Sequence, residues 1–266
     1  MFGSNCHQIF VQKLAKITER PWLARLQNLL SLGGVHYYMH ETAGWQTRVY
    51  LYNYFSFLSD SNFLASWDIT VYNRLGVKVA HRTGELKARE TQIIEVSEIG
   101  PVDEFGVIHV HVRPHQPDYF LPKPYNTIFF VEHYIPGTDK SIIAHSLGSP
   151  QASHFSYHRI STSWITPVGF RPVLFVANSC FFNRVFHPYC GRGNATFINY
   201  KNHKRTVAIP SFGPLACRKI DLFTVDPRLS DHLAGQPYSI EVEGRNILSK
   251  PFILQTSDAA ILAEHL

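Results

Sequence analysis

The chain has 266 residues, of which 45% are hydrophobic, 14% aromatic and only 17% charged, so its composition excludes an intrinsically disordered protein. That length suits two domains of ordinary size or one large all-β unit. The net charge of +5 includes one local basic cluster, residues 201–205 at a predicted hairpin, which is no strong signal for nucleic-acid binding.

The four cysteines follow no regular spacing and include no C-x-x-C pair. Free thiols in a reducing compartment are therefore expected, with a Cys180–Cys190 disulfide as the alternative in an exported protein. The N-terminus has no continuous apolar stretch of the kind that a signal peptide needs. No apolar run approaches the ~20 residues of a membrane span. We therefore expect a cytoplasmic protein without a transmembrane segment.

Residues 1–34 contain the only region with a helical period. Ile9, Phe10, Leu14 and Ile17 recur at helical spacing, and Pro21 suits the first turn of a second amphipathic helix. We expect an N-terminal helical segment that caps the first β-domain. An oligomerisation arm and a membrane-surface helix are the alternatives, the latter because basic residues recur in this segment.

After residue 34 the period of the apolar residues changes to two, which is typical of β-strands. Residues 107–112 form a clean alternating strand. Residues 85–99 carry helix-forming side chains, yet positions 91–96 read as two alternating faces, so strands are predicted there. Short strands separated by turns, without helical crossovers, predict antiparallel sandwiches or jelly rolls.

A sequence motif appears twice and suggests a duplication. Residues 36–45 read H-x-aromatic-x-H followed by Trp, residues 154–164 repeat this pattern, and further strand-like blocks follow each copy in the same order. We therefore predict an all-β fold of two tandem antiparallel β-sandwich domains, jelly-roll or Ig-like, from an internal duplication. The predicted units are the helical segment 1–34, the first sandwich 35–148 and the second sandwich 149–266.

Part of the first copy resembles a known family. The strand at 67–73 is followed at 86–96 by the sequence LKARETQIIEV, and His40, Glu41 and Thr42 precede both. These motifs, with the stretch 252–258 of the second copy, resemble the sensory rhodopsin transducer family of small β-sandwich proteins. Members of that family have one domain, whereas this chain is doubled. The resemblance implies a non-enzymatic sandwich used for association or ligand recognition, and it assigns no catalytic residues.

Fifteen histidines make a metal site one hypothesis. His109 and His111 alternate on a predicted strand, which places both imidazoles on one face about 7 Å apart at the Cα atoms. His115 would help to complete a site for a divalent metal. The alternative is an outward-facing polar ladder, because the second copy has Glu241 and Glu243 at the corresponding positions.

The repeated motif supplies a second set of candidates, for ligand binding: His40, Glu41, Trp45, His158, Arg159 and Trp164. Their polar groups and tryptophan rings would contact a ligand at equivalent places in both copies. The alternative is structural, with the histidines forming hydrogen bonds near strand ends and the tryptophans packed in the cores. Four residues along a strand span about 13 Å, so neither histidine pair of the motif easily holds a metal ion alone.

We expect a non-catalytic protein that binds a glycan or a protein partner through its end loops or the interface between the copies. No cofactor is expected. A metal-dependent enzyme using the histidines of 107–118 is the competing hypothesis, and a homo-oligomeric assembly protein is a third. The sequence has no G-x-S-x-G motif and no phosphate-binding glycine loop in a suitable context.

Overall fold

The computed structural model describes residues 33–42, 44–58, 62–115, 129–146, 157–178, 190–233, 235–247, 251–257 and 261–265. The predicted N-terminal helices fall in residues 1–32 and lie outside this part of the chain. No helix of the described ranges has the length and apolar character that a bilayer crossing requires. Cys190 and Cys217 are free thiols, and the other two cysteines lie outside the described ranges.

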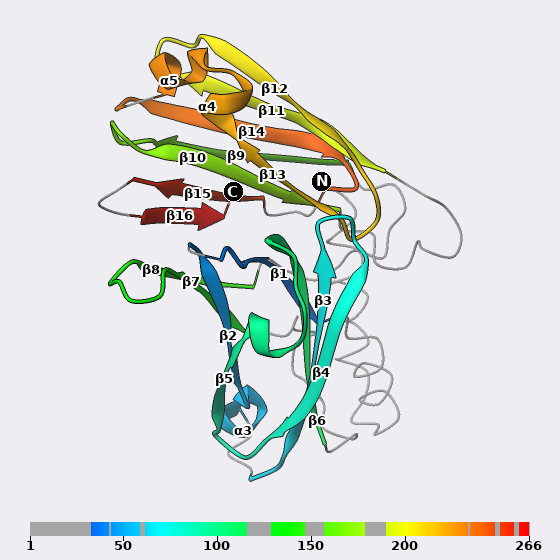
Figure 1. The fold of residues 1–266 in the computed structure, drawn as a ribbon. Helices are drawn as coiled ribbons and strands as arrows, with labels where there is room; N and C mark the ends of the chain where they lie inside the picture. The colour runs from blue at the N-terminus through cyan, green and yellow to red at the C-terminus, as the bar shows by residue number, and fades with distance from the viewer. Residues whose placement is uncertain are drawn as a thin grey trace.

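The all-β prediction is confirmed, because the described residues form antiparallel sheets with only short helices between them (Figure 1). The strands of the first half are β1 (Gly34–Met39), β2 (Gln46–Tyr52), β3 (Ala65–Asn73), β4 (Lys78–Leu86), β5 (Thr91–Glu95), β6 (Phe105–Pro114), β7 (Phe130–Tyr134) and β8 (Ser141–His145). Its helices are α3 (Tyr54–Leu58) and the 3-10 turn η1 (Val96–Glu98). Strand β5 confirms the preference for strand over helix at 91–95.

The second half is built in the same way. Its strands are β9 (Tyr157–Ile165), β10 (Arg171–Ala177), β11 (Gly191–Asn199), β12 (Lys204–Phe212), β13 (Cys217–Asp221), β14 (Pro237–Arg245), β15 (Phe252–Thr256) and β16 (Ile261–His265). Its helices are α4 (Leu222–Val225) and α5 (Arg228–Leu233). The predicted boundary between residues 148 and 149 falls in a stretch outside the described residues.

Each half contains two four-stranded sheets, and the strand order of the first half recurs in the second. Sheet A has the order β1-β6-β3-β4, and sheet C has the order β9-β14-β11-β12. Sheet B has the order β5-β2-β7-β8, and sheet D has the order β13-β10-β15-β16. Every strand of the first half therefore has a counterpart in the second half, eight strands later.

The β3–β4 and β11–β12 turns fix which residues correspond. Asn73 Oδ1 accepts hydrogen bonds from the backbone N–H groups of Leu75 and Val77, at 3.1 and 2.9 Å. Asn199 Oδ1 accepts the same two bonds, from residues 201 and 203, at 3.1 and 3.0 Å. Both turns have a positive φ at the third residue after the asparagine, 77° at Gly76 and 60° at Asn202. Asn73 and Asn199 are therefore equivalent, and the strand registers extend this equivalence across the sheets.

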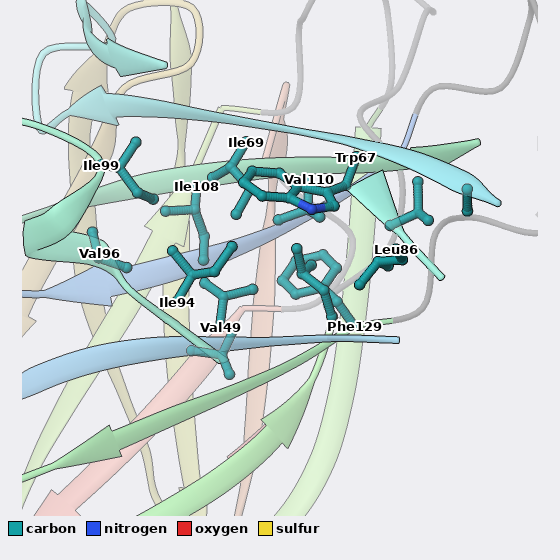
Figure 2. Close-up of a cluster of buried hydrophobic side chains, with 14 of the residues drawn as sticks. Val49, Trp67, Ile69, Leu86, Ile94, Val96, Ile99, Ile108, Val110 and Phe129 are labelled. Carbon is teal, nitrogen blue, oxygen red and sulfur yellow. The ribbon is translucent and has the colours of Figure 1, made fainter. Parts of the chain in front are cut away.

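The two sheets of each half pack face to face around an apolar core. Inward-pointing side chains alternate along the strands, as they do for Val49 on β2, Ile69 on β3 and Val110 on β6 (Figure 2). A second core joins sheets C and D around Leu174, Phe197 and neighbouring residues. Burial of these side chains, each contributing about 1.5–3 kcal/mol, supplies most of the driving force that packs the sheets together.

A third core joins the two halves. Strand β1 is buried on both faces, with Tyr38 in the first core and the alternate residues Val35, Tyr37 and Met39 facing sheet D. There they meet Phe175 and other apolar residues of β10, β13 and β15. The outer face of sheet D is therefore an internal docking surface, and Figure 1 shows β15 and β16 beside the first half.

The predicted alignment of the repeated histidine motif is wrong. His36 pairs with Ile108, whereas Ile240, the equivalent of Ile108, pairs with Thr162. Thr162 therefore occupies the place of His36, and His154 lies outside the described residues. The resemblance between the two motifs was local sequence similarity, because backbone pairing with β6 and β14 sets the actual register.

Candidate functional site

The outer face of sheet A carries a block of polar side chains on three neighbouring strands. Because alternate residues of a strand share a face, the register aligns them in three rows, which we call the polar grid: His109, Thr70 and His81; His111, Asp68 and Thr83; Arg113, Ser66 and Glu85. Directly opposed side chains on neighbouring strands lie close enough to interact. Asp68 therefore stands at the centre of the block.

Asp68 is held by two neighbours from the first row. His81 Nε2 lies 2.8 Å from Asp68 Oδ2. The Thr70 hydroxyl donates to Asp68 Oδ1 at 3.4 Å. The side chains of His81 and Asp68 remain 37% and 43% exposed, so a ligand on this face can reach both.

Arg113 fixes the buried imidazole of His111. Arg113 Nη2 and Nε lie 2.8 and 3.0 Å from His111 Nδ1. Burial, followed by the charges of Arg113 and His109, lowers the pKa of His111 to about 3. The ring is therefore neutral at physiological pH, and its Nδ1 lone pair accepts a hydrogen bond from the guanidinium group.

Residues of the second and third rows of the polar grid, those of His111 and Arg113, line an open pocket of about 390 Å³. It is lined by Ser66, Trp67, Asp68, Thr83, Gly84, Glu85, His111 and Arg113. A Cβ atom at Gly84 would overlap the indole of Trp67, so glycine lets that ring lie against β4. The indole N–H donates to Gln92 Oε1 at 3.1 Å and thereby links β3 to β5 of sheet B. The pocket floor is thus tied to both sheets.

The pocket offers hydrogen-bonding groups of every kind to one ligand. The carboxylates accept, the guanidinium group donates, and the hydroxyls of Ser66 and Thr83 do both. Glu85 also lies 3.6 Å from His115 Nε2. This mixture suits an uncharged ligand rich in hydroxyl groups better than it suits an ion of either sign.

The predicted metal ligands are only partly brought together. His109 and His111 share a face as expected, with ring centroids 6.5 Å apart, but His115 lies just beyond β6 beside Glu85. In the ranges that the structure describes, no three histidine, cysteine, aspartate or glutamate side chains are grouped to hold a metal ion. The metal site stays a prediction, and the guanidinium group on His111 Nδ1 does not favour it.

The correspondence of the polar ladder with the second half is confirmed by the strand registers. Glu241, Glu243 and Arg245 of β14 take the places of His109, His111 and Arg113. Asn194 and Thr206 take the places of Asp68 and His81. The second half therefore has a different polar face, without the Asp68–His81 pair.

The predicted ligand residues of the first copy lie where the two halves meet. His40 Nδ1 is 2.6 Å from Gln46 Oε1, and Glu41 Oε1 is 2.7 Å from Lys219 Nζ of β13. Trp45 packs against the third core. These three contacts are structural. The Glu41 and Trp45 contacts belong to the interface between the halves, whereas the His40–Gln46 contact lies within the first half.

The predicted ligand residues of the second copy lie on β9. Arg159 Nη2 is 2.8 Å from Glu241 Oε2 on the neighbouring strand. Trp164 packs against the core of the second half, at the position that Tyr38 occupies in the first. The backbone of His158 pairs with Gly244, and its side chain lies outside the described residues. The two sets do not form equivalent sites.

The sequence interpretation missed Asp68, His81 and Glu85. The available signal was the alternation of Ser66, Asp68 and Thr70 with apolar residues in a predicted strand. Pairing with His81 and Glu85 depends on the β3–β4 register, which has an irregularity at Val71 and Tyr72. A pattern of alternation cannot specify that shift.

No protein-family model matches the chain, and no curated protein is recognisably similar to it. Among solved structures, a glycosyl hydrolase family 2 member from Bacteroides cellulosilyticus aligns at 10% identity, over 88% of this chain and 26% of that chain, with a TM-score of 0.17. A family 2 member from Bacteroides cellulosilyticus DSM 14838 aligns at 10% identity, over 88% and 28% of the two chains, with a TM-score of 0.15. This chain thus spans less than a third of their length, and a likeness at these scores supports no inference about function.

Proposed function

We propose that this is a non-catalytic binding protein that takes a sugar in the pocket of the polar grid. The observation that carries the proposal is the pocket between β3, β4 and β6, where two carboxylates, two hydroxyls and a guanidinium group converge. Sugar hydroxyls donate and accept hydrogen bonds, so this set satisfies several of them at once. The volume of about 390 Å³ lies at the lower end of the range for small-molecule sites, which favours a single sugar unit.

An internal duplication accounts for the architecture. The matching strand orders, the paired asparagine turns and the aligned rows of β6 and β14 support it. Under this proposal the halves are tandem β-sandwich domains, and only the first has acquired the Asp68–His81 pair. The association role implied by the sensory rhodopsin transducer resemblance is compatible with a binding protein.

Titration of the protein with monosaccharides tests the proposal. Glucose, galactose, mannose, xylose, fucose and N-acetylglucosamine would be examined by saturation-transfer NMR and calorimetry. We expect at least one to bind, and we expect Asp68→Asn to weaken that binding about tenfold because a charge-assisted hydrogen bond is lost. Glu243→Gln, on the corresponding face of the second half, is the matched control and should leave binding unchanged.

Two results would refute the proposal. The first is that none of these sugars binds the protein. The second is that a sugar binds equally well to the Asp68→Asn variant and the unchanged protein, provided that circular dichroism shows both to be folded.

A further inference from the structure

The outer face of sheet B, on the opposite side of the first sandwich from the polar grid, combines aromatic rings with charged groups. We call this surface the ring face, and its members are Arg48, Tyr50, Tyr52, Ile93, Glu95, Phe130, Glu132, Tyr134 and Ile143. They alternate with the inward residues of the first core on four adjacent strands. The surface includes residues of all four strands of the sheet.

The centre of the ring face is an ordered charge network. Arg48 Nε lies 3.3 Å from Glu132 Oε2 and 3.6 Å from Glu95 Oε1. The Tyr50 hydroxyl donates to Glu132, and the Tyr134 hydroxyl donates to Glu95 at 2.8 Å. The guanidinium carbon of Arg48 stands 3.9 Å from the centroid of the Tyr134 ring. Both carboxylates are thus held in place. The Glu95 side chain is 29% exposed and can accept a further hydrogen bond from a ligand, whereas the Glu132 side chain is only 11% exposed and anchors the network.

Aromatic side chains flank this network. The rings of Tyr52 and Phe130 stack with centroids 6.1 Å apart and planes inclined by 22°. Phe130 is 38% exposed, and the two isoleucines at the edges, Ile93 and Ile143, are 55% and 59% exposed. These side chains provide apolar surface that remains open to a partner.

Sheet D shows what the same face looks like when it docks on protein. The registers place Val173, Phe175, Ala177, Phe252 and Leu254 where the ring face has Arg48, Tyr50, Tyr52, Phe130 and Glu132. Four of these five residues are at most 2% exposed, and all pack in the third core. The protein-docking version of this face is therefore built of aliphatic and phenylalanine side chains.

Compared with the outer face of sheet D, the ring face has aromatic rings at the two phenylalanine positions but charged side chains at two of the aliphatic positions. Arg48 occupies the position of Val173, and Glu132 occupies the position of Leu254. Tyr50 occupies the position of Phe175 and carries an additional hydroxyl group. Covering this network with an apolar protein surface would desolvate three charges without replacing their contacts with water. A suitable occupant must stack on rings and also hydrogen-bond to carboxylates.

We infer that the ring face binds an extended, uncharged polysaccharide chain. The C–H faces of successive sugar units lie on the rings of Tyr52 and Phe130, and their hydroxyls donate to Glu95, the more exposed of the two carboxylates. The inference extends the sugar class of the proposed function to a second site on another sheet. It depends on the comparison of sheets B and D and not on the pocket, so either proposal can fail alone.

The test uses the full chain on a printed microarray of plant, microbial and animal glycans, followed by calorimetry with the soluble hexasaccharide of each chain that binds. We expect binding to at least one uncharged glycan chain. Tyr52→Ala and Glu95→Gln should each weaken it at least tenfold. Tyr200→Ala removes an aromatic side chain that is 60% exposed on the β11–β12 turn, and this matched control should not alter binding.

The outcomes separate the two sites. Asp68→Asn should leave chain binding unchanged, whereas Tyr52→Ala should leave monosaccharide binding in the pocket unchanged. If no glycan on the array binds, or if both ring-face variants bind as well as the unchanged protein, the inference is wrong. Self-association that Tyr52→Ala abolishes, in the absence of glycan binding, would overturn it in favour of a protein-docking surface. If Glu95→Gln fails to fold, the Tyr52→Ala and Tyr52→Ser variants provide the test.

Discussion

Lys219 Nζ lies 2.7 Å from Glu41 Oε1, and this ion pair joins β13 of the second half to the segment that follows β1 in the first. It stands at the rim of the third core, where both side chains are about one-third exposed (33% and 32%). The apolar residues behind it hold the halves together, and the ion pair aligns them.

We expect this pair to contribute little to stability. A double-mutant cycle of Glu41→Ala and Lys219→Ala should give a coupling free energy of about 0.2–1 kcal/mol, because exposed ion pairs are screened by solvent. Urea unfolding at low and high salt measures it, and the coupling should shrink in 1 M NaCl. A coupling that is several times larger or independent of salt would contradict this picture.

Acid should destabilise the protein through His133, which is fully buried on β7. The hydroxyl of Thr47 lies 3.0 Å from its Nδ1, and burial lowers the pKa of His133 to about 3 in the folded state, against an ordinary value of 6.5. Between pH 6.5 and pH 3, His133 is therefore protonated in the unfolded chain but stays neutral in the folded chain. The free energy of unfolding should fall by about 1.4 kcal/mol per pH unit for this group.

His133→Gln isolates that effect, since Gln255 occupies the equivalent position on β15. The free energy of unfolding, measured by urea at pH 7 and pH 5, should depend less steeply on pH in the variant. Leu75→Ala removes an exposed side chain that cannot titrate, and this control should retain the slope of the unchanged protein. Equal slopes for His133→Gln and the unchanged protein would contradict the prediction.

Truncating Phe252 should weaken the joint between the halves. Phe252 is 1% exposed, and its ring lies 5.4 Å from that of His36 and 6.1 Å from that of Phe175. Phe252→Ala should cost about 3–5 kcal/mol of stability because it leaves a cavity in the third core. Calorimetry should show two transitions in place of one if the halves then unfold separately, whereas Tyr200→Ala should change stability by no more than about 0.5 kcal/mol.

A buried asparagine after β2 should not tolerate a carboxylate. Asn53 Nδ2 donates to the carbonyl oxygens of Phe63 and Lys87, at 2.9 and 3.1 Å. Asn53→Asp replaces that donor by an acceptor facing carbonyl groups, so we expect a loss on the order of 3 kcal/mol. Asn178, its counterpart after β10, contacts Phe212 O at 3.4 Å, so Asn178→Asp should cost less. Thermal unfolding of the two variants compares them directly.

Local patterns in the sequence were enough to predict the class of fold and part of the polar face. Two-residue alternation identified β6, and the H-x-H-x-R and E-x-E-x-R rows were correctly matched because both strands keep an unbroken alternation. The motif at residue 36 was misaligned because β1 and β9 have little sequence similarity and correspond only through the strands with which they pair. His36 and Thr162 are equivalent by backbone hydrogen bonding, which side-chain identity does not record.

The candidate site was less accessible to prediction because its members come from different strands. Asp68 and His81 lie on different strands and belong to no common sequence motif. Only the β3–β4 register brings their side chains together. The ring face presented a similar difficulty. Alternation along β2 places Tyr50 and Tyr52 on one face, but whether that face is covered depends on how the halves dock.

The side chains that join the halves in the third core are not reproduced at the corresponding positions of the other half. Strand β9 occupies the place of β1, yet Ser161 and Ser163 stand where β1 presents Val35 and Tyr37 to sheet D. Sheet B likewise presents the charges of the ring face where sheet D presents apolar side chains. The joint between the halves therefore depends on two apolar surfaces, one face of β1 and the outer face of sheet D, that the corresponding strands of the other half do not reproduce.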